Sequence, residues 1–156
     1  MIRLERIHLL SRADKLQPLR NFVRELASQQ GCCDENLDCM VMAINEACMN
    51  VIQHAYGGRE DGEIIIEFWK DDCELLVRIY DFAEKVDLQA IKSRDLDEVR
   101  PGGLGVHIIH QVMDSVEYKN QPDSVGNVLE MRKQLSIPVK CNVGTSDKNK
   151  TKNSLD

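Results

Sequence analysis

Two side chains that could bind a metal ion and move a proton lie four residues apart in this chain. Glu46 and Asn50 fall in a helix-forming run, where residues four apart share one face. Carboxylate and carboxamide oxygens are ligands that Mg²⁺ accepts, and a carboxylate can also take a proton. An exposed Glu and Asn on an amphipathic helix are more often merely solvated. The pair predicts a magnesium site only if a second motif accompanies it.

The second motif is a glycine cluster that runs directly into an apolar segment of helical length. It reads Arg100-Pro101-Gly102-Gly103-Leu104-Gly105 and is followed by Val106 to Ile109. Glycines let a backbone approach a ligand closely, and the first N–H groups of a helix favour phosphates. Most glycine clusters are only turns, so its weight comes from its place about 50 residues after the Glu46 and Asn50 helix. Together the two motifs predict a phosphate-binding site.

The elements that must position these groups follow from the periodicity of apolar residues. Alternation predicts strands at residues 2–10, 63–70, 73–80, 115–119 and 127–135. Helical spacing predicts helices at residues 14–30, at residues 104–113, and from a cap at Asp34 to the glycines Gly57-Gly58. In this long helix a stripe of apolar side chains lies opposite Glu46 and Asn50: Leu37, Val41, Ile44, Cys48, Val51 and Ala55. One helix face builds core, and the other is available to ligands.

The order of these elements favours an α+β fold. We expect a two-layer α/β sandwich in which three helices cover one face of a mixed five-stranded sheet. Residues 86–103 are long enough to form a lid. The expected domain spans residues 1–137, and residues 138–156 are expected to form a disordered polar tail.

The combined pattern resembles the histidine-kinase-like ATPase (GHKL) superfamily, and within it the anti-sigma-factor serine/threonine kinase branch. The matching residues are, in order, Glu46, Asn50, His54, Tyr56, Asp81, the Gly102-Gly103-Leu104-Gly105 cluster and Met113-Asp114. The resemblance covers roughly residues 1 to 135. It implies the two-layer fold given above and a homodimer.

The resemblance also implies roles for individual residues. Asn50 would coordinate a Mg²⁺ ion that bridges the phosphates of ATP, and Asp81 would accept the adenine amino group. Backbone N–H groups in the cluster, at Gly103 and Gly105 above all, would bind phosphate. Separately, the place of Arg100 just before Pro101-Gly102 predicts that its guanidinium reaches the γ-phosphate; the alternative is a solvated loop arginine. Glu46 would act as the base. The family's substrate is a serine or threonine on a small antagonist protein, and its second partner is a sigma factor.

One difference from the family favours an alternative function. The superfamily usually has glycines two and four residues after its Asp, whereas this chain has Ala83 and Lys85. Ala83 leaves room for a nucleotide base, but Lys85 puts a charged side chain where the family has a glycine with its permissive backbone. The alternative is a non-catalytic module of the same fold that regulates a partner by sequestration. If the protein were purely structural, the pattern of Glu46, Asn50 and the glycines would be a coincidence.

Composition restricts the class of protein further. A chain of 156 residues suits one domain, and a net charge of −6 argues against a nucleic-acid binder. No apolar run approaches 18 residues, and the first residues lack the pattern of a signal peptide, so we expect a cytoplasmic protein without a membrane segment. The six cysteines contain no Cys-x-x-Cys pair, which favours free thiols, some of them in the core. His54 is expected at the helix end or in packing, not as a metal ligand.

Overall fold

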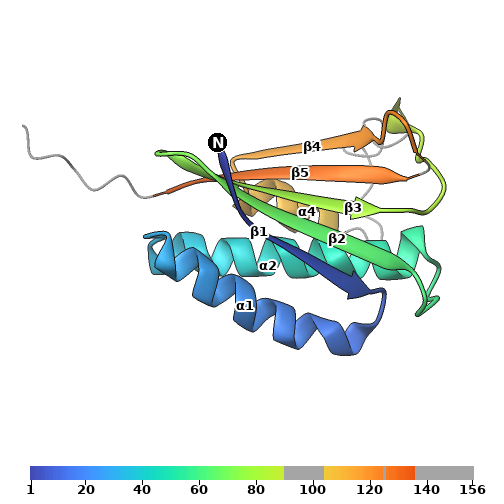
Figure 1. Ribbon diagram of the computed structural model, residues 1–156, viewed down its shortest axis with the longest axis horizontal. Helices are drawn as coiled ribbons and strands as arrows, with labels where there is room; N and C mark the ends of the chain where they lie inside the picture. Colours follow the sequence, from blue (N-terminus) through green and yellow to red (C-terminus); the bar gives the residue numbers. More distant parts are fainter. Residues whose placement is uncertain (90–103, 125, 136–156) are drawn as a thin grey trace, which may run out of the picture.

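The computed structural model describes residues 1–89, 104–124 and 126–135 (Figure 1). Its strands are β1 (Ile2–Leu10), β2 (Glu63–Lys70), β3 (Glu74–Asp81), β4 (Ser115–Asn120) and β5 (Asn127–Gln134). Its helices are α1 (Leu16–Gln29), which follows a short 3-10 turn at Ala13–Lys15, α2 (Asp34–Asn50), which continues as the π-helical turn η2 (Val51–Ala55), and α4 (Leu104–Val112). Every predicted strand and helix is confirmed at nearly the expected bounds.

One predicted helix boundary needs correction. The N-cap of α2 is Cys33, in extended backbone conformation, and Asp34 is already the first helical residue. Asp34 and Glu35 therefore place negative charge in the first turn, where the helix dipole favours it. The predicted tail and most of the predicted lid lie outside the described residues.

The five strands form one sheet in the order β1-β2-β3-β5-β4, and each neighbouring pair is antiparallel. The expected α+β sandwich is confirmed, but the expectation of a mixed sheet is wrong. β3 and β4 both run antiparallel to β5, so they point in the same direction. Because β5 lies between them, these two like-directed strands never pair.

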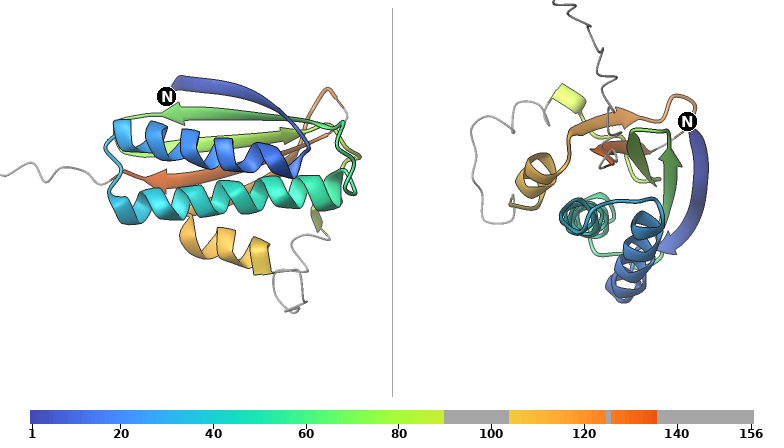
Figure 2. Two further views of the ribbon diagram at one scale, coloured as in Figure 1. Left: turned by 90° about the horizontal axis from the view of Figure 1, so that it is seen from below. Right: turned by 90° about the vertical axis from the view of Figure 1, so that its left-hand side faces the viewer.

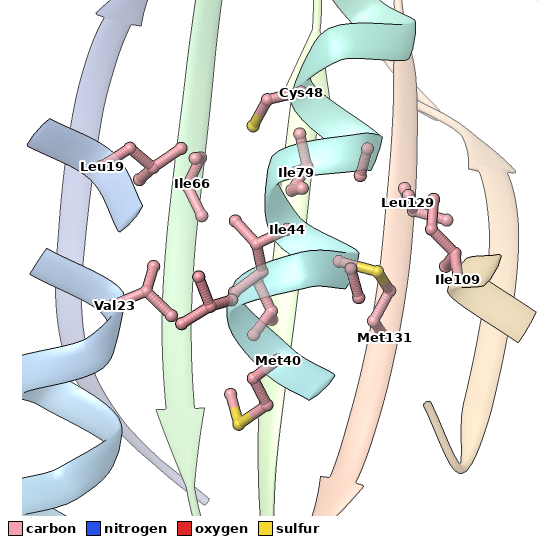
Figure 3. Close-up of a cluster of buried hydrophobic side chains, with 14 of the residues drawn as sticks. Leu19, Val23, Met40, Ile44, Cys48, Ile66, Ile79, Ile109, Leu129 and Met131 are labelled. Atoms are coloured by element: carbon pink, nitrogen blue, oxygen red, sulfur yellow. The ribbon is translucent and has the colours of Figure 1, made fainter. Parts of the chain in front are cut away.

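The described helices lie on one face of the sheet, with α2 between α1 and α4 (Figure 2). The apolar stripe predicted on α2 faces the sheet: Leu37, Val41, Ile44 and Cys48 are buried. Burial raises the pKa of the Cys48 thiol to about 12, so this cysteine is an inert part of the core, as expected. Figure 3 shows Ile44 and Cys48 of this stripe in a cluster with side chains of α1, α4 and the strands. Each large apolar side chain buried in this way contributes about 1.5–3 kcal/mol before the cost of ordering it.

None of the described helices covers the other face of the sheet, yet this face has buried carboxylates. Along β2, Ile64, Ile66 and Phe68 belong to the core, so Glu67 points to the open face. By the same alternation, Glu130 of β5 points there from between Leu129 and Met131. Long charged and aromatic neighbours cover both carboxylates, which are 7% and 6% exposed.

Candidate functional site

The half-exposed side of α2 presents Glu46 and Asn50 to the beginning of α4. A methyl group added at Gly105 would lie 2.8 Å from Oε2 of Glu46. It would lie 3.6 Å from Oδ1 and 3.7 Å from Nδ2 of Asn50. The structure therefore brings together three of the predicted site residues. A side chain at position 105 would have to displace the Glu46 carboxylate, so the glycine lets the start of α4 lie close to this side of α2.

α4 is held in this place by its own apolar side. Ile109 is fully buried and Met113 nearly so, and both belong to the core cluster that α2 shares. α2 and α4 are accordingly in extensive contact. Because α4 begins at Leu104, its first N–H groups lie beside Gly105 and thus near Glu46 and Asn50. Free N–H groups at a helix start attract anions.

Asp81, a further predicted site residue, is the last residue of β3 and is 6% exposed. Its Oδ1 accepts hydrogen bonds from the side-chain amide of Asn127 (2.9 Å) and from the backbone N–H of Ala83 (3.1 Å). Burial raises the pKa of Asp81 above its usual value, although these two hydrogen bonds act in the opposite direction. The carboxyl is fixed in place by neutral donors.

Asn127 is a site residue that the sequence did not reveal. It stands directly opposite Asp81 in the β3–β5 register. Besides bonding Asp81, its Nδ2 donates to the carbonyl of Glu84 (3.0 Å), and its Oδ1 accepts from the backbone N–H of Val86 (2.9 Å). One amide thus fixes both the carboxylate and the backbone that follows it. Knowledge of the strand register, which neither strand's own pattern contains, would have been needed to find it.

The turn between β4 and β5 supports Asp81 from the backbone side. Gln121 donates from Nε2 to the Asp81 carbonyl oxygen at 3.0 Å. Gly126, at φ +131°, lies so close to this carbonyl that any side chain there would collide with it. The segment after β3 is therefore held by side-chain amides where the superfamily pattern has glycines.

A pocket of about 570 Å³ opens between the end of η2 and this segment. Its walls are residues His54 to Gly57 and Arg59 on one side and Ala83 to Val86 on the other. Ala83 is buried, whereas Lys85 is exposed, so the lysine lies in the wall of the pocket without being packed inside the protein. His54 is exposed at the end of the helix, which agrees with its expected place.

Several predicted site residues are not described. Arg100, Gly102 and Gly103 lie outside the described residues, as does most of the predicted lid. Leu104 is described as the first residue of α4, but only as backbone.

The residues present fit a magnesium-bound phosphate. Within the described ranges, no cluster of three or more His, Cys, Asp or Glu side chains could hold a metal ion without other ligands. Mg²⁺ usually takes one or two protein oxygens and completes its shell with phosphate and water, so the Asn50 side chain beside the start of α4 suits one of its ligands. Among the described helices, none is long and apolar enough to cross a membrane.

Comparison with known proteins agrees with this geometry. Residues 9–133 match the model of the histidine kinase-like ATPase domain. The chain is 35% identical over 102 residues to the serine-protein kinase RsbW of Bacillus pumilus, and 34% identical over 100 residues to that of Listeria monocytogenes. Each match covers 59% of this chain, and they span only 63% and 64% of the relatives' lengths.

Solved structures share the fold at low sequence identity. The SiaB–SiaC complex of Pseudomonas aeruginosa contains a chain that matches with a TM-score of 0.62 at 14% identity, over 85% of this chain and 91% of that one. The RsbU and RsbW domains of a Mycobacterium tuberculosis protein match with a TM-score of 0.61 at 15% identity, over 85% of this chain and 33% of that one. With the family match over most of its length, the chain belongs to the histidine kinase-like ATPase domain family.

Proposed function

We propose that this protein is an ATP-dependent serine/threonine kinase of the anti-sigma-factor type. In this proposal it binds Mg-ATP, phosphorylates a small antagonist protein and sequesters a sigma factor while the antagonist is phosphorylated. The observation that carries the proposal is the close approach of the start of α4, at Gly105, to Glu46 and Asn50. The names of the RsbW relatives support the kinase activity, although the matches span less than two thirds of those proteins.

Each residue of the site has a chemical task in this proposal. Asn50 would hold Mg²⁺, and the backbone N–H groups of the Gly102–Gly105 cluster, with the guanidinium of Arg100, would bind phosphate. The carboxyl of Asp81 would accept a hydrogen bond from the amino group of adenine. Glu46 would take the proton from the attacking hydroxyl. Bound Mg-ATP supplies the phosphoryl group, whose transfer requires mainly positioning and neutralised charge.

A second function is favoured by one specific feature, the Ala83 and Lys85 pair after Asp81. In that alternative the fold sequesters a partner by surface complementarity and performs no chemistry. Lys85 lies in the wall of the pocket beside the Asp81 segment, where it could lower the affinity for nucleotide. Retention of Glu46, Asn50 and Gly105 favours the kinase, because a module without chemistry has no physical need for this arrangement.

Phosphoryl transfer to a protein partner tests the proposal. The purified chain would be incubated with Mg-ATP labelled at the γ-phosphate and with candidate antagonist proteins from the same genome. We expect label on one serine or threonine of the cognate antagonist, and none when that residue is replaced by alanine. Nucleotide binding without transfer to any cognate partner would favour the sequestration module. Sedimentation of the same sample would test the homodimer that the family resemblance implies.

A further inference from the structure

Tyr56 joins the two elements that bear the proposed nucleotide site. Its ring is buried, at 5% exposed, immediately after η2. Its hydroxyl donates to the carbonyl of Glu63 at the start of β2 (2.5 Å) and accepts the backbone N–H of Phe82 (2.8 Å). Phe82 directly follows Asp81, and Tyr56 lies six residues after Asn50. One hydroxyl therefore connects the end of the Asn50 helix to the residue beside Asp81.

The ring is confined on its sides as well as at its hydroxyl. It lies against the backbone of Gly62, where an added methyl group would come within 2.6 Å of three ring carbons. The guanidinium of Arg59 stands 5.8 Å from the ring centroid, within the range of a cation–π contact. Gly62 is held in turn by the hydroxyl of Ser11, which accepts its backbone N–H at 3.0 Å. Gly62 and Arg59 therefore limit how the ring can shift.

The backbone of η2 directs Tyr56 to this position. The N–H of Tyr56 bonds to the carbonyl of Val51, five residues earlier, so the last turn is wider than an α-helical turn. Such π-helical turns are rare and often occur at functional sites. Here the wide turn changes the rotation at which Tyr56 leaves the helix and brings it over the ends of β2 and β3.

We propose that Tyr56 is a positioning residue that fixes the Asp81–Phe82 backbone relative to α2 and thereby sets the affinity for nucleotide. The inference rests on the proposed nucleotide site and adds a residue that touches neither phosphate nor metal in that proposal. Where the superfamily pattern has permissive glycines after its Asp, this chain has Ala83 and Lys85. Here the segment is held by the Tyr56 hydroxyl at one end and by Asn127 at the other.

The test removes one oxygen atom and compares it with the same change elsewhere. Tyr56→Phe keeps the ring on Gly62 but leaves the Phe82 N–H without its acceptor. Tyr80→Phe is the matched control, because the Tyr80 hydroxyl donates to Oε2 of Glu67 at 3.2 Å on the open face of the sheet. Both variants lose a half-buried tyrosine hydroxyl, so a general loss of stability affects both.

Titration calorimetry and hydrogen exchange provide the measurements. We expect Tyr56→Phe to weaken Mg-ATP and ADP about tenfold, while the rate of phosphoryl transfer at saturating ATP stays within about twofold. The Phe82 amide should exchange faster in the nucleotide-free variant. Tyr80→Phe should change neither affinity nor exchange at Phe82.

Two outcomes would overturn the inference, and they differ. If wild type binds nucleotide and Tyr56→Phe binds it equally well, Tyr56 is merely structural and the proposed function stands. If wild type binds no nucleotide at all, the proposed function fails and this inference fails with it.

Discussion

Two carboxylates on the paired strands β3 and β5 are equally buried and differ in almost everything else. Asp81 and Glu130 are each 6% exposed. Asp81 receives its hydrogen bonds from neutral groups, the Asn127 amide and the Ala83 N–H. Glu130 lies on the open face. Its Oε2 is 2.7 Å from Nε of Arg78, and its Oε1 is 3.2 Å from Nζ of Lys119. One carboxylate is surrounded by neutral donors and the other by cations.

The pKa values move in opposite directions as a result. Burial raises the pKa of Asp81, and two neutral hydrogen bonds do not offset it. Burial alone would also raise the pKa of Glu130, but hydrogen bonds from Arg78 and Lys119, with their charges, bring it below its usual value. A buried carboxylate that is paired with cations stabilises the fold. One buried without a cation costs stability, and such a cost is typical of a group kept for a ligand.

The largest expected effect comes from neutralising Glu46, the proposed base, which lies on the helix-covered side of the sheet with the proposed ligand site. Glu46→Gln keeps the shape of the side chain beside Gly105 and removes its ability to take a proton. We expect phosphoryl transfer to the antagonist to fall by roughly 10²-fold or more, with nucleotide affinity nearly unchanged. Glu35→Gln, an exposed change in the first turn of the same helix, is the control. Transfer by Glu46→Gln at the wild-type rate would remove Glu46 from the role of base.

The next effect separates affinity from stability at Asp81. Asp81→Asn preserves an acceptor for Asn127 and Ala83 but replaces a carboxylate oxygen that would meet the adenine amino group. We expect nucleotide to bind roughly 10- to 100-fold more weakly, as for a lost hydrogen bond to a charged group, while the melting temperature stays the same or rises. Calorimetric titration and thermal unfolding of one sample would show both. A lower melting temperature with normal affinity would make Asp81 a structural residue.

Glu130→Gln should have the reverse effect. The substitution removes the carboxylate charge that pairs with the half-exposed cations. We therefore expect a loss of about 1.5–3 kcal/mol in the free energy of unfolding, measured in urea. Nucleotide affinity should be unchanged. Together with Asp81→Asn this makes a crossed pair, and weakened nucleotide binding in Glu130→Gln would contradict the division between the two faces of the sheet.

In acid, the stability of both variants should approach that of wild type, Glu130→Gln from below and Asp81→Asn from equal or higher stability. The lowered pKa of Glu130 means that its contribution is present above its unfolded pKa and is lost as pH falls through the folded value. The raised pKa of Asp81 means that its charged form is penalised increasingly as pH rises through the folded value. Urea unfolding between about pH 3 and 7 should show Glu130→Gln less stable and Asp81→Asn equally or more stable at neutral pH. Both differences should shrink in acid, and differences that stay constant with pH would refute these assignments.

The sequence predicted what depends on local pattern and missed what depends on pairing. Alternation and helical spacing located the strands and helices, and residue types with their spacing indicated Glu46, Asn50 and Gly105, which the structure brings together. The strand order was not accessible, because a strand's own alternation does not identify its neighbour. For the same reason the sheet was expected to be mixed, and Asn127 was not associated with Asp81.

Binding of Mg-ATP tests the central claim most directly. Unfolding of the full chain would be followed with and without millimolar Mg-ATP, alongside Asn50→Ala, which should lose most of the effect. A ligand at one hundred times its dissociation constant stabilises the native state by about 2.7 kcal/mol, so we predict a clear rise in melting temperature that depends on Mg²⁺. No shift at millimolar Mg-ATP would contradict the account, and Lys85 would then be the first residue to replace with glycine.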